Sequence, residues 1–193
     1  MRTIELALYN QGYLKLVGVD EVGRGPLAGP VVAAAVYLPS DVEIPGLADS
    51  KSLSPRKREA AFYEILRHGH ASIGVATSAE IDRVNILNAT FLAMGRAIQG
   101  LGFKPDYCLV DGNRIIPGFT VPQEAIVKGD AKCRLIAAAS IVAKVIRDRF
   151  MEDCHNAYPE YGFDRHKGYP TAQHRQAILE HGLCSIHRFL LRI

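Results

Sequence analysis

Residues 14–38, LKLVGVDEVGRGPLAGPVVAAAVYL, contain the pattern that decides the fold. Two apolar runs rich in β-branched residues, 14–19 and 31–38, are bounded by Gly and Pro, and this pattern predicts two β-strands. The acidic pair Asp20 and Glu21 ends the first strand, and a connection rich in Gly and Pro follows it. Ligands of open α/β sheets gather beyond strand ends, so the acidic pair marks a candidate site.

Outside this stretch, strand and helix patterns alternate along the chain. Further strands are expected at 71–77, 107–110 and 125–127, and helices at 56–68, 79–83, 86–101, 131–156 and 172–181. Strands followed by alternating strands and helices predict an α/β fold, with a mixed sheet flanked by helices. We expect a catalytic unit over 1–157 and a helical C-terminal extension over 158–193, together forming one compact unit.

The composition sets broad limits on the type of protein. The chain has 193 residues, of which 48% are hydrophobic, and this suits one domain with a sizeable core. Its net charge of +3 is compatible with a polyanionic partner but does not require one. The four cysteines are widely separated, which argues against a zinc site or a disulfide framework. Since no apolar run has the length of a signal peptide or a membrane span, we expect a cytoplasmic protein.

Four acidic residues lie at strand ends or at a helix start, where ligands of α/β proteins often bind. Asp20 and Glu21 end the first strand, Asp111 ends the short strand at 107–110, and Asp130 stands at the start of the long helix. Each acid taken alone could be a turn or cap residue. If the four converge, a cation must offset their repulsion. A site of carboxylates alone suits Mg²⁺ or Mn²⁺ rather than Zn²⁺, and it points to phosphoryl chemistry.

Asp148 is a further acid, but helix geometry excludes it from this group. It follows Asp130 by 18 residues. In a continuous helix the two would be roughly 27 Å apart along the axis. Asp148 is therefore interpreted as part of a surface or end-of-helix ion-pair group with Arg147 and Arg149.

Three loops carry candidate contacts to a nucleic acid. Gly23, Arg24 and Gly25 follow the acidic pair directly, where small residues let the backbone approach phosphate or sugar oxygens. Tyr169 could stack on a sugar or base in the basic loop at 164–171. Lys51 could contact a phosphate. The alternatives are an ordinary connection between strands and solvated basic loops.

Taken in order, these segments resemble the motif series of bacterial ribonuclease HII. The matching segments are 18–26 (GVDEVGRGP), 49–51 (DSK), 111–113 (DGN), 128–130 (KGD), 137–144 (AAASIVAK) and 166–171 (HKGYPT). The resemblance implies a ribonuclease H-like fold and two-metal hydrolysis that leaves a 3′-hydroxyl and a 5′-phosphate. It implies cleavage of the RNA strand of RNA–DNA hybrids, and cleavage 5′ of single ribonucleotides embedded in duplex DNA during ribonucleotide removal.

The resemblance also assigns roles to individual residues. Two divalent ions, Mn²⁺ or Mg²⁺, would be bound by the catalytic acids Asp20, Glu21, Asp111 and Asp130. The 2′-hydroxyl would be contacted by Gly23, Arg24 and Gly25, with Tyr169 packing near it. Further nucleic-acid contacts are expected from Lys51, Asn113 and Lys167.

Two other functions remain open at this stage. Another nuclease of the same broad fold would share the acids but lack Gly-Arg-Gly after Asp-Glu and the Lys-Gly-Tyr loop. A non-catalytic nucleic-acid-binding domain would need no convergent acids, because these repel phosphate. The family usually continues after its C-terminal His-Arg with a basic-Ser-Phe segment, whereas 189–193 read FLLRI here, so duplex contacts at that end are expected to differ. We expect a monomer, and the sequence indicates no protein partner.

Overall fold

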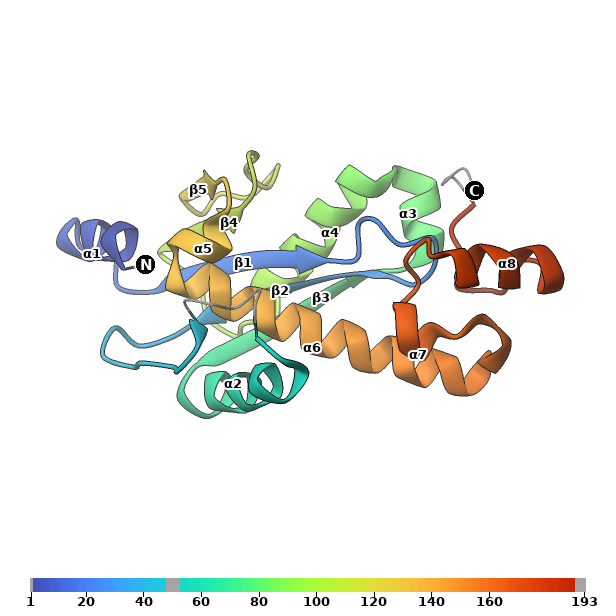
Figure 1. The fold of residues 1–193 in the computed structure, drawn as a ribbon. Helices are drawn as coiled ribbons and strands as arrows, with labels where there is room; N and C mark the ends of the chain where they lie inside the picture. Colours follow the sequence, from blue (N-terminus) through green and yellow to red (C-terminus); the bar gives the residue numbers. More distant parts are fainter. Residues whose placement is uncertain (1, 48–52, 190–193) are drawn as a thin grey trace.

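The computed structural model describes residues 2–47 and 53–189, and a mixed five-stranded sheet forms its centre (Figure 1). The strand order is β3-β2-β1-β4-β5. The strands are β1 (Leu16–Val22), β2 (Val31–Tyr37), β3 (His70–Ala76), β4 (Tyr107–Asp111) and β5 (Gln123–Ile126). The first three pair antiparallel, whereas β1 with β4 and β4 with β5 pair parallel. The predicted mixed α/β sheet is confirmed.

Helices cover both faces of the sheet. They are α1 (Thr3–Asn10), α2 (Pro55–His68), α3 (Ser78–Val84), α4 (Ile86–Gln99), α5 (Gly129–Lys132), α6 (Arg134–Ala157), α7 (Phe163–His166) and α8 (Ala172–His181), with a 3-10 turn at Pro159–Tyr161. The long helix α6 crosses one face, and α4 packs on the opposite face (Figure 1). No helix in the described part of the chain is long and apolar enough to cross a membrane.

Strand β1 separates two hydrophobic cores because alternate residues point to opposite faces. Leu16 packs in the core beneath α6, whereas Val17 and Val19 pack in the core beneath α4. Gly18 faces α6 at a point where no side chain fits. A Cβ added to Gly18 would lie 2.1 Å from the backbone carbon of Leu135. The absence of a side chain therefore lets α6 lie directly on β1.

Two parts of the fold differ from expectation. The helix expected over 131–156 is interrupted at Cys133, which has extended backbone angles (φ −126°, ψ 125°) and separates α5 from α6. Helix α1 was not predicted. Its Glu5 accepts a hydrogen bond from the Leu135 backbone at 3.3 Å and forms an ion pair with Arg134 at 3.2 Å. An acid from a distant helix thus occupies the N-terminus of α6, whose own N-cap residue provides no side-chain cap.

The C-terminal residues pack on the far end of α6 and on the connection between β1 and β2 (Figure 1). The small core at this junction includes Leu27 and Ala28 from the connection, Met151 from α6 and Phe163 from α7. An isolated β-bridge joins Ala28 to His187. Helix α7 occupies part of the segment that was expected to be a loop, and α8 has the predicted Thr171 cap.

Candidate active site

Asp20 of β1 lies beside Asp111, the last residue of the parallel strand β4. The register pairs Val19 of β1 with Val110 of β4, so the next residue on each strand is one of these acids. Alternation places Asp20 on the same face as Gly18, which is the face that α6 covers. Asp111 likewise follows Leu109 to this face, since Leu109 packs in the α6 core.

Asp130 reaches the same end of the sheet through a tight turn after β5. Lys128 adopts a left-handed conformation (φ 57°), and the backbone N–H of Gly129 donates to Asp111 Oδ1 at 2.7 Å. A side chain at Gly129 would collide with Ile136, because an added Cβ would lie 2.5 Å from its Cδ1. Asp130 is then buried in the first turn of α5, with 3% of its surface exposed.

The acids influence one another electrostatically. Asp20 is 6% exposed, and burial raises its pKa well above the usual range, with further increases from Glu21 and Asp111. A hydrogen bond from the Ser140 side chain of α6 opposes this shift. Burial also raises the pKa of Glu21, with a contribution from Asp111, while the charge of Arg24 lowers it. Asp20, Glu21 and Asp111 thus form one interacting group of charges.

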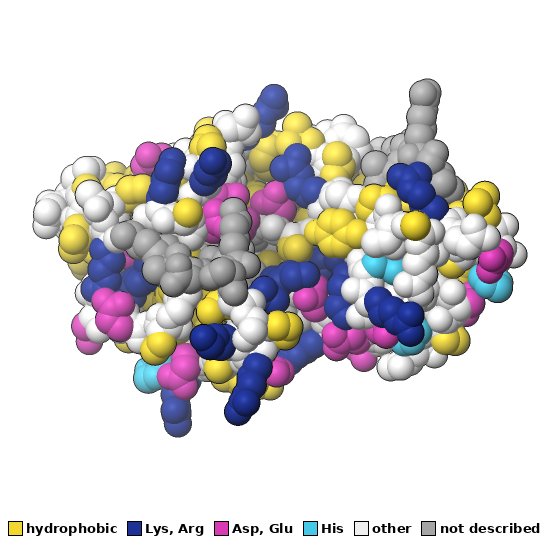
Figure 2. All heavy atoms as spheres, in the orientation of Figure 1, with side chains coloured by type: hydrophobic (Ala, Val, Ile, Leu, Met, Phe, Trp, Pro, Cys, Tyr) yellow, Lys and Arg dark blue, Asp and Glu magenta, His cyan; other side chains and the backbone are white. Residues whose placement is uncertain are grey.

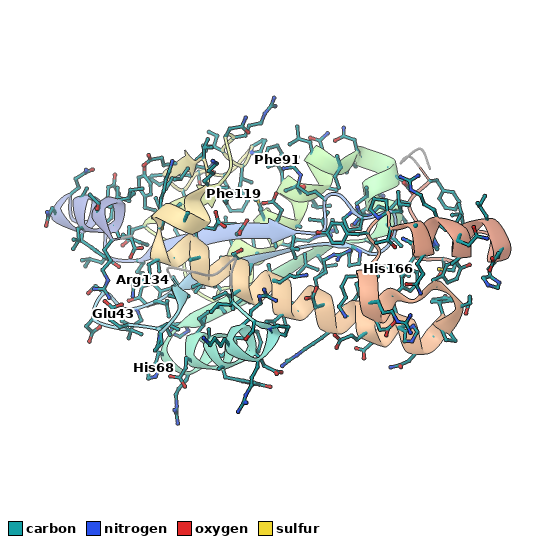
Figure 3. The ribbon with its side chains drawn as sticks, in the orientation of Figure 1. Glu43, His68, Phe91, Phe119, Arg134 and His166 are labelled. Carbon is teal, nitrogen blue, oxygen red and sulfur yellow. The ribbon has the colours of Figure 1, made fainter. Side chains whose placement is uncertain are left out.

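A cleft of about 230 Å³ opens beside these acids. Glu21 and Asp111 line one side together with Asn113, and Thr90 and Phe91 of α4 line the opposite side. Figure 3 shows the position of Phe91 on this helix. Acidic side chains lie in the middle of the face drawn in Figure 2, with Lys and Arg side chains around them.

The donor set suits a hard divalent cation, although the carboxylates have other partners in this arrangement. Asp20 Oδ1 accepts from the Glu21 backbone at 2.7 Å, and Glu21 Oε1 lies 3.3 Å from Arg24. Within residues 2–47 and 53–189, no three His, Cys, Asp or Glu side chains are grouped closely enough to hold one ion. Glu21 Oε2 is nevertheless buried without a hydrogen-bond partner in the described structure. Mg²⁺ or Mn²⁺ would bind such a buried oxygen and would offset the repulsion between the neighbouring carboxylates.

The structure brings most of the expected substrate contacts to this place. Gly25 faces the ring of Tyr169, since an added Cβ would lie 3.7 Å from its Cε1. Arg24 and Asn113 both line the cleft. Lys167 instead pairs with Glu152, with 2.8 Å between Nζ and Oε1. The expected contact at Lys51 lies outside the described residues.

The prediction for the charged group around Asp148 needs a correction. Asp148 forms an ion pair, but its partner is Lys144 at 2.6 Å. Arg149 is on the surface and pairs with Glu59. The prediction that Arg147 lies on the surface is wrong, because this residue is fully buried and donates to three backbone carbonyls. The local sequence does not show whether an arginine of a mostly apolar helix points into the protein and binds backbone carbonyls.

Sequence reasoning also missed Ser140, Phe91 and Arg188. Ser140 contacts Asp20, and Phe91 lines the cleft. Arg188 is buried beneath the Gly-Arg-Gly connection. Ser140 lies in the segment 137–144, which is one of the segments that resemble the family motifs. The other two are ordinary residue types whose positions depend on packing.

Comparison with known proteins decides the family. The sequence model described as "Ribonuclease HII" matches residues 17–193. The chain belongs to the ribonuclease HII family. The ribonuclease HII of Marinomonas sp. is 58% identical over 174 residues, which cover 90% of this chain and 87% of that protein. The ribonuclease HII of Maricaulis maris is 54% identical over 175 residues, covering 91% and 80%, respectively.

Solved structures agree with this assignment. The ribonuclease H2 of Pyrococcus horikoshii has a TM-score of 0.73 at 30% identity, over 90% of this chain and 92% of that one. The ribonuclease HII of Archaeoglobus fulgidus, in a complex with PCNA, has a TM-score of 0.75 at 26% identity, over 93% and 96%. Bst-RNase HIII in complex with Mn²⁺ shares the fold, with a TM-score of 0.68 at 19% identity over 91% of this chain and 72% of that one. The ribonuclease HII resemblance and the ribonuclease H-like fold are confirmed, and the chain is a type 2 ribonuclease H, an endoribonuclease.

Proposed function

We propose that the enzyme cuts the RNA strand of RNA–DNA hybrids and cuts 5′ of single ribonucleotides embedded in duplex DNA. The products would be a 3′-hydroxyl and a 5′-phosphate, and the cellular role would be ribonucleotide removal from DNA. One observation carries this proposal: an interacting group of acids, which includes the buried Asp20, stands directly beside a Gly-Arg-Gly connection and a partly exposed tyrosine. The acids suit phosphodiester hydrolysis, and the connection with the tyrosine suits recognition of a ribose.

Asp20, Glu21, Asp111 and Asp130 would hold two divalent ions, Mn²⁺ or Mg²⁺. When bound, such ions activate water and stabilise negative charge on the phosphate and the leaving oxygen. The protein keeps the carboxylates in place through its backbone: the N–H of Gly129 holds Asp111, and the N–H of Glu21 holds Asp20. Ser140 provides a further hydrogen bond to Asp20. These contacts orient the acids before any ion binds.

Recognition of the ribonucleotide would come from the opposite side of the site. Backbone N–H groups of the connection that contains Gly23, Arg24 and Gly25 would bond the 2′-hydroxyl, and the Tyr169 ring would pack against the sugar. Tyr169 is 38% exposed, which leaves part of its surface available for this contact. Arg24 and Asn113 line the cleft and would contact phosphate or sugar oxygens. Lys51 and Lys167 would contact the duplex backbone farther out.

The remaining assignments are part of the same proposal. The catalytic unit would comprise 1–157 and the C-terminal extension 158–193, within one compact monomer located in the cytoplasm. The extension would contribute Tyr169 and Lys167 to substrate binding. The PCNA complex of the Archaeoglobus fulgidus protein concerns that protein, and no protein partner is proposed for this chain.

The test is cleavage of a labelled DNA duplex that carries one ribonucleotide, with Mg²⁺, with Mn²⁺ and with EDTA. An all-DNA duplex and an Asp20→Asn variant are the controls. We expect a metal-dependent cut 5′ of the ribose by the wild type alone. Cleavage of long hybrids without cleavage of the single-ribonucleotide duplex would favour a type 1-like ribonuclease H. Binding of duplexes by the folded protein without any cut would contradict the catalytic proposal.

A further inference from the structure

Two buried arginines organise the connection between β1 and β2 from beneath. Arg188 is 3% exposed and donates to four backbone carbonyls of this connection. Its Nη2 donates to Gly23 at 2.6 Å, and its Nε donates to Gly29 at 2.8 Å. Its Nη1 donates to Arg24 at 3.2 Å and to Pro26 at 2.8 Å. The guanidinium group of Arg188 thus fixes the direction of four peptide groups in this connection.

Arg147 supports the adjacent part of the connection. It donates to the carbonyl of Pro30 at 3.0 Å, of Ala28 at 3.2 Å and of Lys167 at 3.0 Å. Its guanidinium carbon lies 5.9 Å from the centre of the Tyr169 ring. The 28–30 part of the connection and the segment containing Tyr169 are therefore held by the same side chain, which keeps the two sides of the expected ribose site in register.

The contacts of Arg188 with carbonyl groups also determine the direction of the N–H groups in the same peptides. In a planar trans peptide, the carbonyl of one residue and the N–H of the next point in opposite directions. The Gly23 and Arg24 carbonyls point toward the buried Arg188. The N–H groups of Arg24 and Gly25 must then point away from Arg188. Within the described chain, neither of these two N–H groups donates a hydrogen bond to a backbone carbonyl.

We propose that Arg188 is a positioning residue for ribose selection, which aims the N–H groups of Arg24 and Gly25 at the 2′-hydroxyl of the substrate. The inference rests on the proposed function, because it requires a ribonucleotide in the site. Two adjacent N–H donors that point the same way form a small concave site for an oxygen acceptor. The buried positive charge behind them strengthens the attraction for a partially negative oxygen.

The residue type at 188 follows from this role. A guanidinium group has five N–H donors in a planar fork and no acceptor, so one arginine can hold several carbonyls at once. A lysine ammonium has three donors and cannot reproduce the fork. Burial, together with the charge of Arg147, lowers the pKa of Arg188 to about 9, so its guanidinium still carries its charge at neutral pH. Arg188→Lys would keep the charge while releasing part of the connection.

The experiment measures ribose selection separately from catalysis. Binding of two DNA duplexes, identical except for one ribonucleotide, is compared in the non-cutting Asp20→Asn background with and without Arg188→Lys. We expect Arg188→Lys to lower the ribose preference in Kd about tenfold, with little change in affinity for the all-DNA duplex. Arg149→Lys is the matched control, since it alters an exposed arginine of α6 that pairs with Glu59. An unchanged ribose preference, or equal losses on both duplexes, would overturn the proposal.

A second measurement does not depend on how well the variant folds. In the Asp20→Asn protein with Arg188 intact, the amide ¹H–¹⁵N resonances of Arg24 and Gly25 should shift more with the ribonucleotide duplex than with the all-DNA duplex. Equal shifts would overturn the role of these donors. If the wild type cuts at the ribonucleotide while Arg188→Lys keeps full preference, only this inference fails. If the wild type neither cuts nor prefers the ribonucleotide, the proposed function fails and this inference with it.

Discussion

Asp20 shows at the scale of one residue how the proposed catalytic arrangement opposes stability. Its carboxyl is buried beside Glu21 and Asp111, and its pKa is raised chiefly by burial and then by these two acids. A carboxyl whose pKa is higher in the folded than in the unfolded chain stabilises the fold below its ordinary pKa. That stability is lost as the pH rises through the folded pKa. Asp20 therefore destabilises the metal-free protein above its ordinary pKa, and neutral pH lies in this range.

The Asp20→Asn variant should accordingly be more stable than the wild type and inactive. We expect a gain of at least about 1 kcal/mol in the free energy of unfolding, or a Tm increase of a few degrees, in EDTA at neutral pH. The difference should shrink at low pH, where Asp20 is protonated, and when Mg²⁺ or Mn²⁺ is added. Thermal unfolding followed by circular dichroism measures both. A variant less stable than the wild type in EDTA would contradict this account of the site.

Gly18 is the residue on which the packing of α6 depends. An added Cβ would lie 2.1 Å and 2.3 Å from the backbone carbon and oxygen of Leu135, and neither atom can move without shifting the helix. We expect Gly18→Ala to cost ~3 kcal/mol in urea unfolding, because overpacking displaces the backbone. Gly102→Ala is the control. Its added Cβ meets open space within 4 Å and bears only left-handed strain, at about 1 kcal/mol. Equal losses in the two variants would argue against close α6 packing.

At the scale of elements, α1 and α6 are joined by a buried ion pair. Glu5 is 1% exposed, and Arg134 at the start of α6 is its partner. Figure 3 shows Arg134 at this end of the helix. Glu5→Gln keeps the shape but leaves the guanidinium charge without its carboxylate, so we expect a loss of about 3 kcal/mol in urea unfolding. Glu43→Gln, which breaks an ion pair whose Glu43 side chain is 75% exposed, should change stability by about 0.5 kcal/mol or less. Comparable losses would show that burial is unimportant here.

Three histidine rings pack together within the C-terminal extension, and one of them contacts the backbone of Tyr169. The His166 and His174 rings stack at 4.5 Å, and His166 is labelled in Figure 3. His187 Nδ1 accepts from the Cys184 backbone at 2.9 Å, so its Nε2 carries the proton that bonds His174 Nε2 at 3.1 Å. His174 Nδ1 then donates to the Tyr169 carbonyl at 3.0 Å. This chain of hydrogen bonds requires both imidazoles to be neutral.

The extension should therefore lose stability in mild acid. Burial lowers the pKa of His174 from 6.5 to about 4. Because the unfolded chain takes up the proton first, the stability from neutral His174 is complete above its ordinary pKa and is lost as the pH falls toward 4. Urea unfolding at about pH 7.5 and about pH 5 should show a smaller pH dependence for His174→Asn than for the wild type. His68→Gln, which alters a half-exposed histidine of α2, should keep the wild-type dependence. An unchanged dependence in His174→Asn would contradict the assignment.

At the scale of the whole molecule, the extension and the sheet are linked through the connection between β1 and β2. Backbone hydrogen bonds join Leu27 to Gly168 at 2.8 Å and Gly29 to Ile186 at 2.9 Å. Arg147 and Arg188 add contacts in both directions across this junction. The extension has a small core of its own, but that core includes residues of the connection and of α6. The candidate active site is therefore held in place by contacts with both parts.

We expect such a chain to unfold in one cooperative step. Urea unfolding followed by far-UV circular dichroism and by the amide resonances of α8 should give coincident transitions, because separating the extension would expose the shared core and the two arginines. The comparison with residues of β1 in the same spectra is the internal control. An earlier transition confined to α8 would show that the extension is an independent unit.

Local patterns in the sequence determined much of this protein. Apolar runs rich in β-branched residues and bounded by Gly and Pro predicted β1 and β2, because a strand that is covered on both faces has a continuous apolar sequence. The ordered motifs predicted the family, which the comparisons confirm, and the acids near strand ends predicted a site whose assignment stays a proposal. These signals are local, because each depends on residues within one turn or one strand.

The tertiary structure alone decided which residues far away in the sequence contact these strands, helix ends and acids. Glu5 caps a helix 130 residues away, Ser140 contacts Asp20, and Arg188 holds carbonyls 159 to 165 residues before it. The strand order was also not readable, since pairing depends on how the chain crosses the sheet. The sequence does not distinguish a buried arginine that binds backbone carbonyls from an arginine on the surface. Their difference arises only when packing removes water and the backbone must provide the partners instead.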